Sequence, residues 1–411
     1  MQSVIYLRFF LLVICAISAY AALPTFPLIT GLGGVIGSDY LPYANELVFV
    51  EYDGKLSSIR LQTAIVSSGT TVLRGTYSFN FDTGADEAAS DSDVFWEQVN
   101  QVIREMVPLR NARIVNIGNI GAAKFDRLTS TSLQEVIYGT TPINGDNNAG
   151  NKLVNGDVFA VLTNGGNLAK VLVTNYGYDI TFKWVTYKLN PTYQILGEGY
   201  NQPEDVVTSA DRVHVYITER SGDLVRAQLT NGNRAAATVV SQGLNAPQQL
   251  ALDETHSYAY VVEFASPGRL LRIDLHNGAK TTLIGNLQYA IGLLVTPDGE
   301  TAYVTEQLSN NVGRLSRINL TTKKRQVLYT SSTAPLFFLT WANPSQSAIL
   351  VTERDPANKV WLIDLTRSPP IVSQLSAPVP PRPSSVAVVF SSFLLVSSDS
   401  IISALYPLIA A

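Results

Sequence analysis

The chain has almost no cysteine, the residue through which small extracellular proteins form disulfide cross-links. Its only cysteine is Cys15, which lies in an apolar N-terminal segment. The remainder can therefore form neither disulfides nor cysteine metal sites, and thiol catalysis is excluded. Histidine is also scarce, with three residues. Stability must come from a large apolar core, for which the 46% hydrophobic residues are sufficient material.

Clusters of basic residues are sparse as well. The longest is Lys323-Lys324-Arg325, and the formal net charge of the chain is -4. Nucleic-acid binding depends on concentrated positive charge. Nucleic acid is therefore not an expected partner.

Residues 1–22 have the pattern of a secretory signal peptide. Arg8 precedes an apolar run, and Ala19-Tyr20-Ala21 supplies a small-x-small cleavage site. The run is shorter than the roughly 20 residues that cross a bilayer. We therefore expect a secreted, extracellular protein whose mature chain has no membrane span. The apolar segment 393–411 is interrupted by serines and an aspartate, which favours strands over a lipid-anchor signal.

A short motif of apolar residues followed by an acid recurs along the chain. Its copies end in Glu51, Glu219, Glu263, Glu306 and Glu353, and a weaker copy ends in Asp399. From Glu219 onward the acids are 44, 43, 47 and 46 residues apart, the period of a four-stranded propeller blade. We predict an all-β fold, a six-bladed β-propeller.

The last repeat contains only three expected strands, and its fourth is predicted at the other end of the chain. Residues 25–32 read like 281–287, the fourth strand of a complete repeat. The N-terminal strand should pair with the C-terminal blade and close the ring, which removes an exposed strand edge.

The interval between Glu51 and Glu219 is 168 residues, so about 123 residues exceed one blade step. We predict a small α+β domain inserted in blade 1, between its third and fourth strands. The expected boundaries are a signal peptide at 1–22, propeller at 23–66, the inserted domain at 67–192 and propeller at 193–411.

Within the insertion, apolar residues at helical spacing predict an amphipathic helix over 93–107 that Pro108 ends. Alternating and apolar runs predict strands at 157–163, 168–174 and 179–189. The helix prediction depends on Phe95, Val99, Val102, Ile103 and Met106.

Two known groups of proteins have similar repeats. Tyr303-Val304-Thr305-Glu306 and the segment 310–318 resemble the repeats of streptogramin lyase and NHL-type six-bladed propellers, and more loosely those of the gluconolactonase class. The likeness covers 34–66 and 193–411, and the insertion resembles no family. The lyase resemblance implies a His, a Glu and a divalent metal. The segments that open the first strands contain no histidine, so lyase chemistry is not expected here.

The recurring acids are the first candidate site. Each ends a second strand, so Glu51, Glu219, Glu263, Glu306, Glu353 and Asp399 should lie toward one axial face. They could hold calcium or polarise water. Alternatively each bonds backbone or an arginine, and Arg226, Arg272 and Arg317 recur in register. Identical use in every repeat favours this structural role.

Glu204 and Asp205 form the one asymmetric acidic cluster expected on that face. The gluconolactonase resemblance implies a Glu, an Asn and an Asp around one calcium, and Asn201 is near in sequence. The alternative is a solvated turn. Calcium is therefore the one metal considered, and no cofactor is required.

Other motifs are weaker. Phe81-Asp82-Thr83-Gly84 resembles the catalytic loop of retroviral-type aspartic proteases, but those enzymes pair two such loops and the sequence has one. Asn319-Leu320-Thr321 is an acceptor for N-glycosylation.

We therefore expect a secreted, non-catalytic scaffold that binds an extracellular glycan or protein. Aromatics of the insertion could stack on sugars, although such residues are more often core residues; they are Tyr176, Tyr178, Trp184 and Tyr187. The alternative is a calcium-dependent lactonase-like or lyase-like enzyme with its site at the axial face. An enzyme should gather unlike polar groups at one axial point, whereas a scaffold should bond its acids blade by blade around an apolar axis.

Overall fold

The computed structural model describes residues 25–86, 91–253, 255, 257–309, 311–375, 379–389 and 393–405. The signal-peptide prediction at 1–22, Cys15 and His256 lie outside these residues. Over the described chain the contacts define two compact units: residues 62–190, which we call the middle unit, and residues 25–61 with 191–405, the propeller unit. Within the described ranges no helix is long and apolar enough to cross a membrane.

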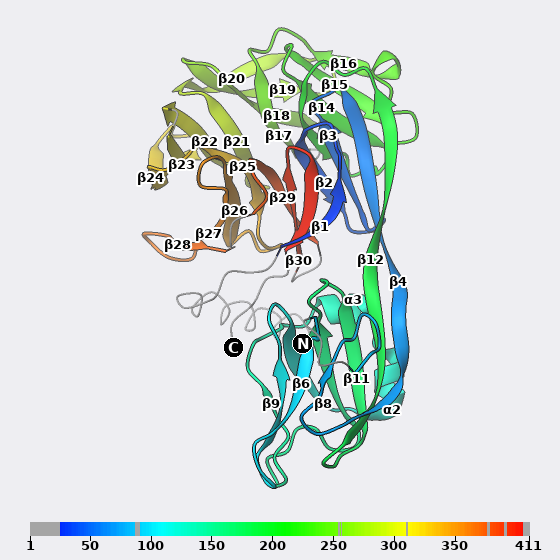
Figure 1. The fold of residues 1–411 in the computed structure, drawn as a ribbon. Coiled ribbons are helices and arrows are strands. Elements are labelled where there is room, and N and C mark those ends of the chain that lie inside the picture. Colours follow the sequence, from blue (N-terminus) through cyan, green and yellow to red (C-terminus); the bar gives the residue numbers. More distant parts are fainter. Residues whose placement is uncertain are drawn as a thin grey trace. The chain divides into compact units, whose positions relative to one another are not determined.

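The propeller unit consists of antiparallel sheets of four strands, six of them in the described residues (Figure 1). The first contains β2 (Val35–Leu41), β3 (Glu46–Glu51) and parts of β4 (Lys55–Leu73) and β12 (Ile180–Glu198). The second contains β13 (Pro203–Thr208), β14 (His214–Glu219), β15 (Asp223–Gln228) and β16 (Thr238–Ser241). The third contains β17 (Pro247–Asp253), β18 (Tyr258–Glu263), β19 (Gly268–Asp274) and β20 (Lys280–Leu287).

The other three sheets follow the same order. The fourth contains β21 (Ala290–Val295), β22 (Thr301–Ser309), β23 (Val312–Asn319) and β24 (Arg325–Ser331). The fifth contains β25 (Leu336–Trp341), β26 (Ala348–Glu353), β27 (Lys359–Asp364) and β28 (Ile371–Gln374). The last contains β29 (Pro383–Val389), β30 (Phe393–Ser398), β31 (Ile401–Leu405) and, from the other end of the chain, β1 (Thr25–Thr30).

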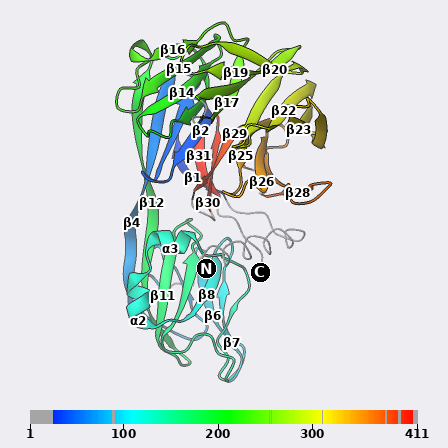
Figure 2. The same cartoon turned by 180° about the vertical axis from the view of Figure 1, so that it is seen from behind.

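The pairing of β1 with β31 confirms the predicted closure. The two strands are antiparallel, and Phe26 lies opposite Ala404 while Thr30 lies opposite Ile401. In Figures 1 and 2 the dark blue β1 lies beside the red C-terminal strands. Without β1 the backbone of β31 would be an open edge.

The first strands of the sheets contact one another in a closed cycle: β2, β13, β17, β21, β25, β29 and back to β2. This arrangement is a β-propeller. Each first strand has a register shift near its start, and such a bulge leaves backbone groups unpaired within the sheet.

Side chains of neighbouring sheets bond the inner strands all around the cycle. Asp39 accepts from Thr208 N at 2.8 Å, and Asp205 accepts from Leu250 N at 2.9 Å. Gln249 accepts from Leu293 N of the next sheet and also from Leu339 N of the sheet beyond it. The remaining junctions have hydroxyl donors: Thr305 to Phe337 O, Thr352 to Ser384 O and Ser384 to Val35 O.

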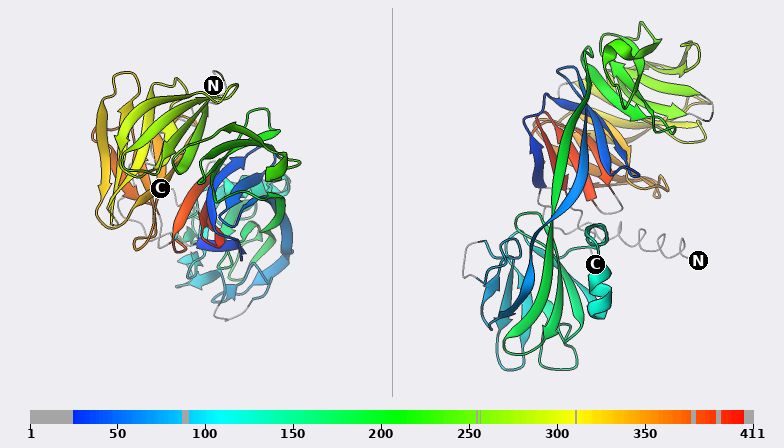
Figure 3. Two further views of the ribbon diagram at one scale, coloured as in Figure 1. Left: turned by 90° about the horizontal axis from the view of Figure 1, so that it is seen from above. Right: turned by 90° about the vertical axis from the view of Figure 1, so that its right-hand side faces the viewer.

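Two strands of the first sheet continue into the middle unit. β4 and β12 are each 19 residues long and lie side by side (Figure 3, right, blue and green). They belong to one seven-stranded sheet, which continues in the middle unit with β11 (Leu168–Asn175), β10 (Asp157–Leu162) and β8 (Arg113–Asn119). A separate four-stranded sheet of the middle unit contains β5 (Ser78–Phe79), β6 (Val94–Gln98), β7 (Arg104–Pro108) and β9 (Ile143–Asn144).

An aromatic cluster forms the core of the middle unit. It includes Phe79, Phe81, Trp96, Phe182 and Trp184, with ring centroids as close as 4.9 Å. The helices α2 (Gly121–Arg127) and α3 (Ser130–Gln134) lie against β11 (Figure 2). The predicted strands at 157–163, 168–174 and 179–189 are confirmed as β10, β11 and the start of β12.

The helix predicted over 93–107 is wrong. This segment is the hairpin of β6 and β7, in which Trp96 lies opposite Met106. The turn forms because Asn100 Oδ1 accepts from the backbone of Val102 and Ile103, both at 2.8 Å. Apolar residues at the exposed tip mimicked the helical spacing, and 57% of Val99 is exposed.

The hairpin and the helix predict different effects of substitutions on the free energy of unfolding. Trp96 is fully buried and its Nε1 donates to Tyr178 O at 2.9 Å. Trp96→Ala should lower the free energy of unfolding by about 3–5 kcal/mol, whereas Val99→Ala should change it by less than about 0.5 kcal/mol. Chemical denaturation of the two variants measures this. A larger cost at Val99 would restore the helical interpretation.

Candidate functional site

The acids that end the second strands are buried and engaged within their own sheets. Glu51, Glu219, Glu263 and Glu306 each accept from the backbone N–H 18 residues earlier in the chain, at distances of 2.6–2.9 Å. That N–H belongs to the segment that enters the first strand. The carboxylate therefore fixes the start of each sheet, as expected of a buried acceptor.

Each of these carboxylates also has side-chain partners. Glu51 accepts from Ser57 and Tyr193, and the others pair with arginines: Arg234 with Glu219, Arg269 with Glu263, and both Arg314 and Arg325 with Glu306. The arginines differ from those that the sequence suggested, since Arg226, Arg272 and Arg317 lie opposite Tyr216, Tyr260 and Tyr303 instead.

A proline changes the pattern in the fifth sheet. The residue 18 positions before Glu353 is Pro335, which has no N–H to donate. Glu353 instead accepts from Ser331, from Thr333 at 2.8 Å and from Trp361 Nε1 at 2.7 Å.

In the last sheet the acid is absent, and Asp399 is not its counterpart. Strand pairing places Ser398 opposite Pro383, as Glu219 lies opposite Pro203 and Glu353 opposite Leu336. Asp399 is thus one residue beyond the register position of the acids. The sequence interpretation was wrong here because a shift of one residue points a side chain to the other face.

The residue after each of the five glutamates, and the one after Ser398 in the last sheet, lines a cavity of about 590 Å³ in the propeller unit. These six rim residues are Tyr52, Arg220, Phe264, Gln307, Arg354 and Asp399. In four of the sheets their backbone N–H donates to a carbonyl 18 residues earlier, and that of Arg354 donates to Pro335 O, 19 residues earlier. The main chain is therefore held in nearly the same way in these five sheets, while the side chain differs from sheet to sheet. Because Arg220, Arg354 and Arg382 all line it, we call this cavity the arginine pocket.

The first strands supply part of the lining of the arginine pocket. Ile36, Ile291 and Phe337 belong to one buried apolar cluster, in which Phe337 stacks on Phe338 with ring centroids 4.9 Å apart. Glu204 and Gln248, both 2% exposed, add polar groups to this lining.

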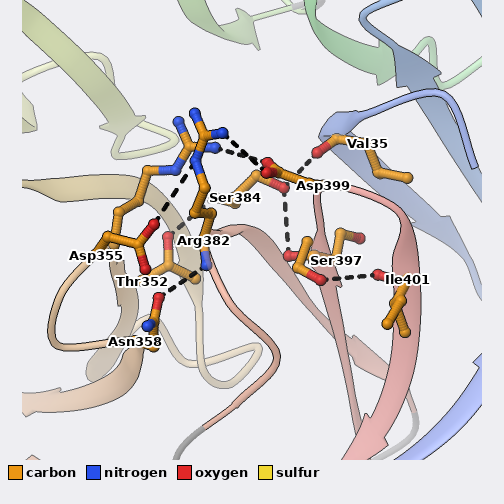
Figure 4. Close-up of polar contacts among 11 residues, drawn as sticks. Val35, Thr352, Asp355, Asn358, Arg382, Ser384, Ser397, Asp399 and Ile401 are labelled. Atoms are coloured by element: carbon orange, nitrogen blue, oxygen red, sulfur yellow. Dashed lines mark hydrogen bonds and ion pairs between the residues drawn. The ribbon is translucent and has the colours of Figure 1, made fainter.

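The charged groups of the arginine pocket form two clusters. In one, Arg220 Nη1 lies 2.8 Å from Glu204 Oε1. Burial raises the pKa of the Glu204 carboxyl, and the bond from Arg220 opposes the rise. In the other, Asp399 lies between Arg354, at 3.2 Å, and Arg382, at 3.0 Å. Figure 4 shows Arg382 with Asp399 on one side and Asp355 on the other.

Arg354 is the most confined of the three cations. Its guanidinium carbon lies 4.4 Å from the centroid of the Phe337 ring, a cation–π geometry. Its Nε is buried and has no hydrogen-bond partner among the described residues. Burial lowers the pKa of Arg354, and the nearby charge of Arg382 lowers it further.

A second cavity, of about 560 Å³, is lined by the ends of the first strands; it contains Asp39 and Asp205, and we call it the aspartate pocket. Burial raises the pKa of Asp39 to about 6 and raises the pKa of Asp205 well above its usual range. Gly37 is required here, because a Cβ at that position would lie 2.2 Å from Asp205 Oδ1.

The structure does not bring the predicted pair Glu204 and Asp205 together. Glu204 lines the arginine pocket and Asp205 lines the aspartate pocket. Across the described residues there is no group of three or more His, Cys, Asp or Glu side chains placed to hold a metal. His214 pairs with Asp211 at 2.6 Å.

The remaining candidates have local partners. Asp82 of the protease-like loop accepts from Thr163 and Asn167, each at 3.0 Å. Asn319 ends β23, and its Oδ1 accepts from the backbone of Thr321 and Thr322. Of the aromatics in the middle unit, Trp184 is buried in the core and Tyr178 is 59% exposed.

Sequence reasoning named Asp399 but missed the other five rim residues, because it considered only the residue types that recur in every repeat. The period-two alternation of a strand places residues n and n+1 on opposite faces. If the side chain of the acid lies on one face of the strand, the side chain of the next residue lies on the other face. That rule, applied to the same repeats, would have identified five of the six rim residues.

The acids should contribute to stability. Glu263→Ala leaves the backbone N–H of Asn245 without its 2.8 Å acceptor and removes both bonds from Arg269. The expected loss is about 2 kcal/mol, measured by chemical denaturation. The exposed Glu300 is a matched control, since Glu300→Ala should change stability by less than about 0.5 kcal/mol. Equal effects at the two positions would contradict the structural role.

The aspartate pocket predicts a pH dependence. A carboxyl whose pKa is raised by folding binds more protons in the folded state, so its contribution to stability is present below pH 3.8 and is lost as pH rises through about 6. Asp39→Asn keeps an acceptor for Thr208 N but does not ionise. The fall in melting temperature between pH 5 and pH 7.5 should be smaller in this variant than in wild type. An unchanged fall would contradict the assignment.

Comparison with known proteins gives only distant structural likeness. No family model matches the chain, and no curated protein does. Among solved structures, a chain of the nidogen/laminin complex matches with a TM-score of 0.44 and 13% identity, over 57% of this chain and 82% of that one. The hydrazine synthase of Kuenenia stuttgartiensis matches at 0.41 and 15%, over 59% and 71%. A putative TolB from Agrobacterium tumefaciens matches at 0.42 and 12%, over 50% and 73%.

Proposed function

We propose that this protein is a secreted, six-bladed β-propeller scaffold, with a domain inserted in its first blade, that binds a glycan or protein partner outside the cell without transforming it. The partner is bound in the arginine pocket. This binding requires no cofactor. Secretion is inferred from residues 1–22, which have the pattern of a signal peptide.

One observation carries the binding proposal. The six rim residues occupy equivalent positions, and their side chains have five different chemistries within one cavity. Positions that serve only the fold can hold the same residue type in sheet after sheet, as the neighbouring glutamates do. The rim positions hold different residue types, which favours a role in binding. Concave pockets with a few convergent polar groups on an apolar lining are the usual form of a ligand site.

The arginine pocket gathers unlike polar groups, as expected of an enzyme, but other observations favour the scaffold over the calcium-dependent enzyme. That enzyme would use Glu204 and Asp205 around one ion, but these side chains line different cavities. The five glutamates are occupied by backbone, hydroxyl, indole and guanidinium donors of their own sheets. The apolar cluster of Ile36, Ile291, Phe337 and Phe338 agrees with the apolar axis expected of a scaffold.

Filling the arginine pocket should abolish partner binding. Gln307→Trp adds a large ring at the rim, whereas Gln326→Trp adds the same ring at an exposed position on β24, outside the pocket. The wild-type protein and Gln326→Trp should be retained on extracellular-matrix or cell-wall preparations, and Gln307→Trp should lose at least about tenfold in affinity. Absence of retention on all these surfaces, or equal retention of the three proteins, would overturn the proposal.

A further inference from the structure

We propose that the arginine pocket recognises the carboxylate of an acidic sugar, a hexuronate unit of an extracellular glycan. This inference rests on the proposed function and specifies its ligand. It is carried by the charge of the pocket, by the donors of Arg354 and by the mixture of amide and aromatic groups around them.

The pocket attracts an anion. Three arginines line it against two carboxylates, Glu204 and Asp399, so the lining residues carry one net positive charge when all are ionised. Arginine has no neutral form at physiological pH. Glu204 is occupied by Arg220 at 2.8 Å. Arg354 and Arg382 share Asp399, and Arg382 also lies 3.8 Å from Asp355, which does not line the pocket. Arg354 is therefore the cation with the least compensation.

Arg354 has donors to spare. A guanidinium group carries five N–H donors, and Arg354 contacts Asp399 through Nη2 while its buried Nε has no partner among the described residues. The ring of Phe337 supports its plane at 4.4 Å. A fixed planar fork of this kind matches the two oxygens of a carboxylate.

The rest of the lining fits a sugar ring. Gln307 and Gln248 offer amide donors and acceptors for hydroxyl groups, and Phe264 and Tyr52 offer aromatic surface for the apolar face of a ring. The cavity, about 590 Å³, is the size of a small-ligand pocket. An acidic peptide would use the charges but not this combination of amides and rings.

The resident carboxylate of Asp399 supplies a distinctive test. Because it occupies donors of Arg354 and Arg382, it competes with the carboxylate of a ligand. Its removal should strengthen binding, an effect that damage to the fold cannot produce. Removal of the Arg354 charge should weaken binding by about tenfold or more, the ordinary worth of a charge-assisted pair.

Titration calorimetry of the whole purified chain tests the inference with three probes: trigalacturonate, the neutral galactotriose and hexaglutamate. Wild type should bind trigalacturonate at least about tenfold more tightly than the other two. Arg354→Gln should weaken this binding and Asp399→Asn should strengthen it. Arg317→Gln, at an exposed position on β23 outside the pocket, should leave it unchanged.

The outcomes separate the two proposals. Preference for hexaglutamate or galactotriose, or trigalacturonate binding that Arg354→Gln does not weaken, overturns the uronate inference. The uronate inference is also overturned if none of the three probes binds. In that case the scaffold proposal stands, provided that Gln307→Trp still reduces retention on matrix preparations. If the wild-type protein is not retained on any of these preparations, the scaffold proposal itself is overturned.

Discussion

The fold depends on hydrogen bonds that pass between sheets. A bulge at the start of each first strand leaves backbone groups that its own sheet does not pair, and side chains such as Asp205, Gln249 and Thr352 of the preceding sheet bond to that strand. Because the last sheet bonds to the first through Ser384 and Val35, the series is a ring with no free end. Each junction tolerates only residues that can reach a neighbouring backbone.

The same regularity leaves room for a binding site. In four of the sheets the acid and the backbone of its successor are both tied to positions 18 residues earlier. The side chain of the successor is under no such constraint and points into the arginine pocket. Six positions are thereby presented to one cavity on a rigid frame. Because these positions are already rigid, less conformational entropy is lost when a ligand binds.

Local patterns were reliable where a single periodicity dominated. The four-stranded repeats and the pairing of 25–32 with the last sheet could be predicted because alternation and turn residues recur over many copies. The segment 93–107 could not, since two short strands and the turn at Asn100 produced apolar spacings that match a helix. Only burial distinguishes the two, and burial depends on the aromatic core that surrounds Trp96.

By itself, the sequence determined the repeat, its period, the strand that closes the ring and the absence of cysteine chemistry outside residues 1–22. Tertiary structure alone decided which side chains share a cavity. Glu204 and Asp205 are neighbours in sequence yet line different pockets, whereas Tyr52 and Asp399 are far apart in sequence and line the same one. The physical reason is that strand alternation separates adjacent residues, and ring closure unites equivalent positions of different sheets.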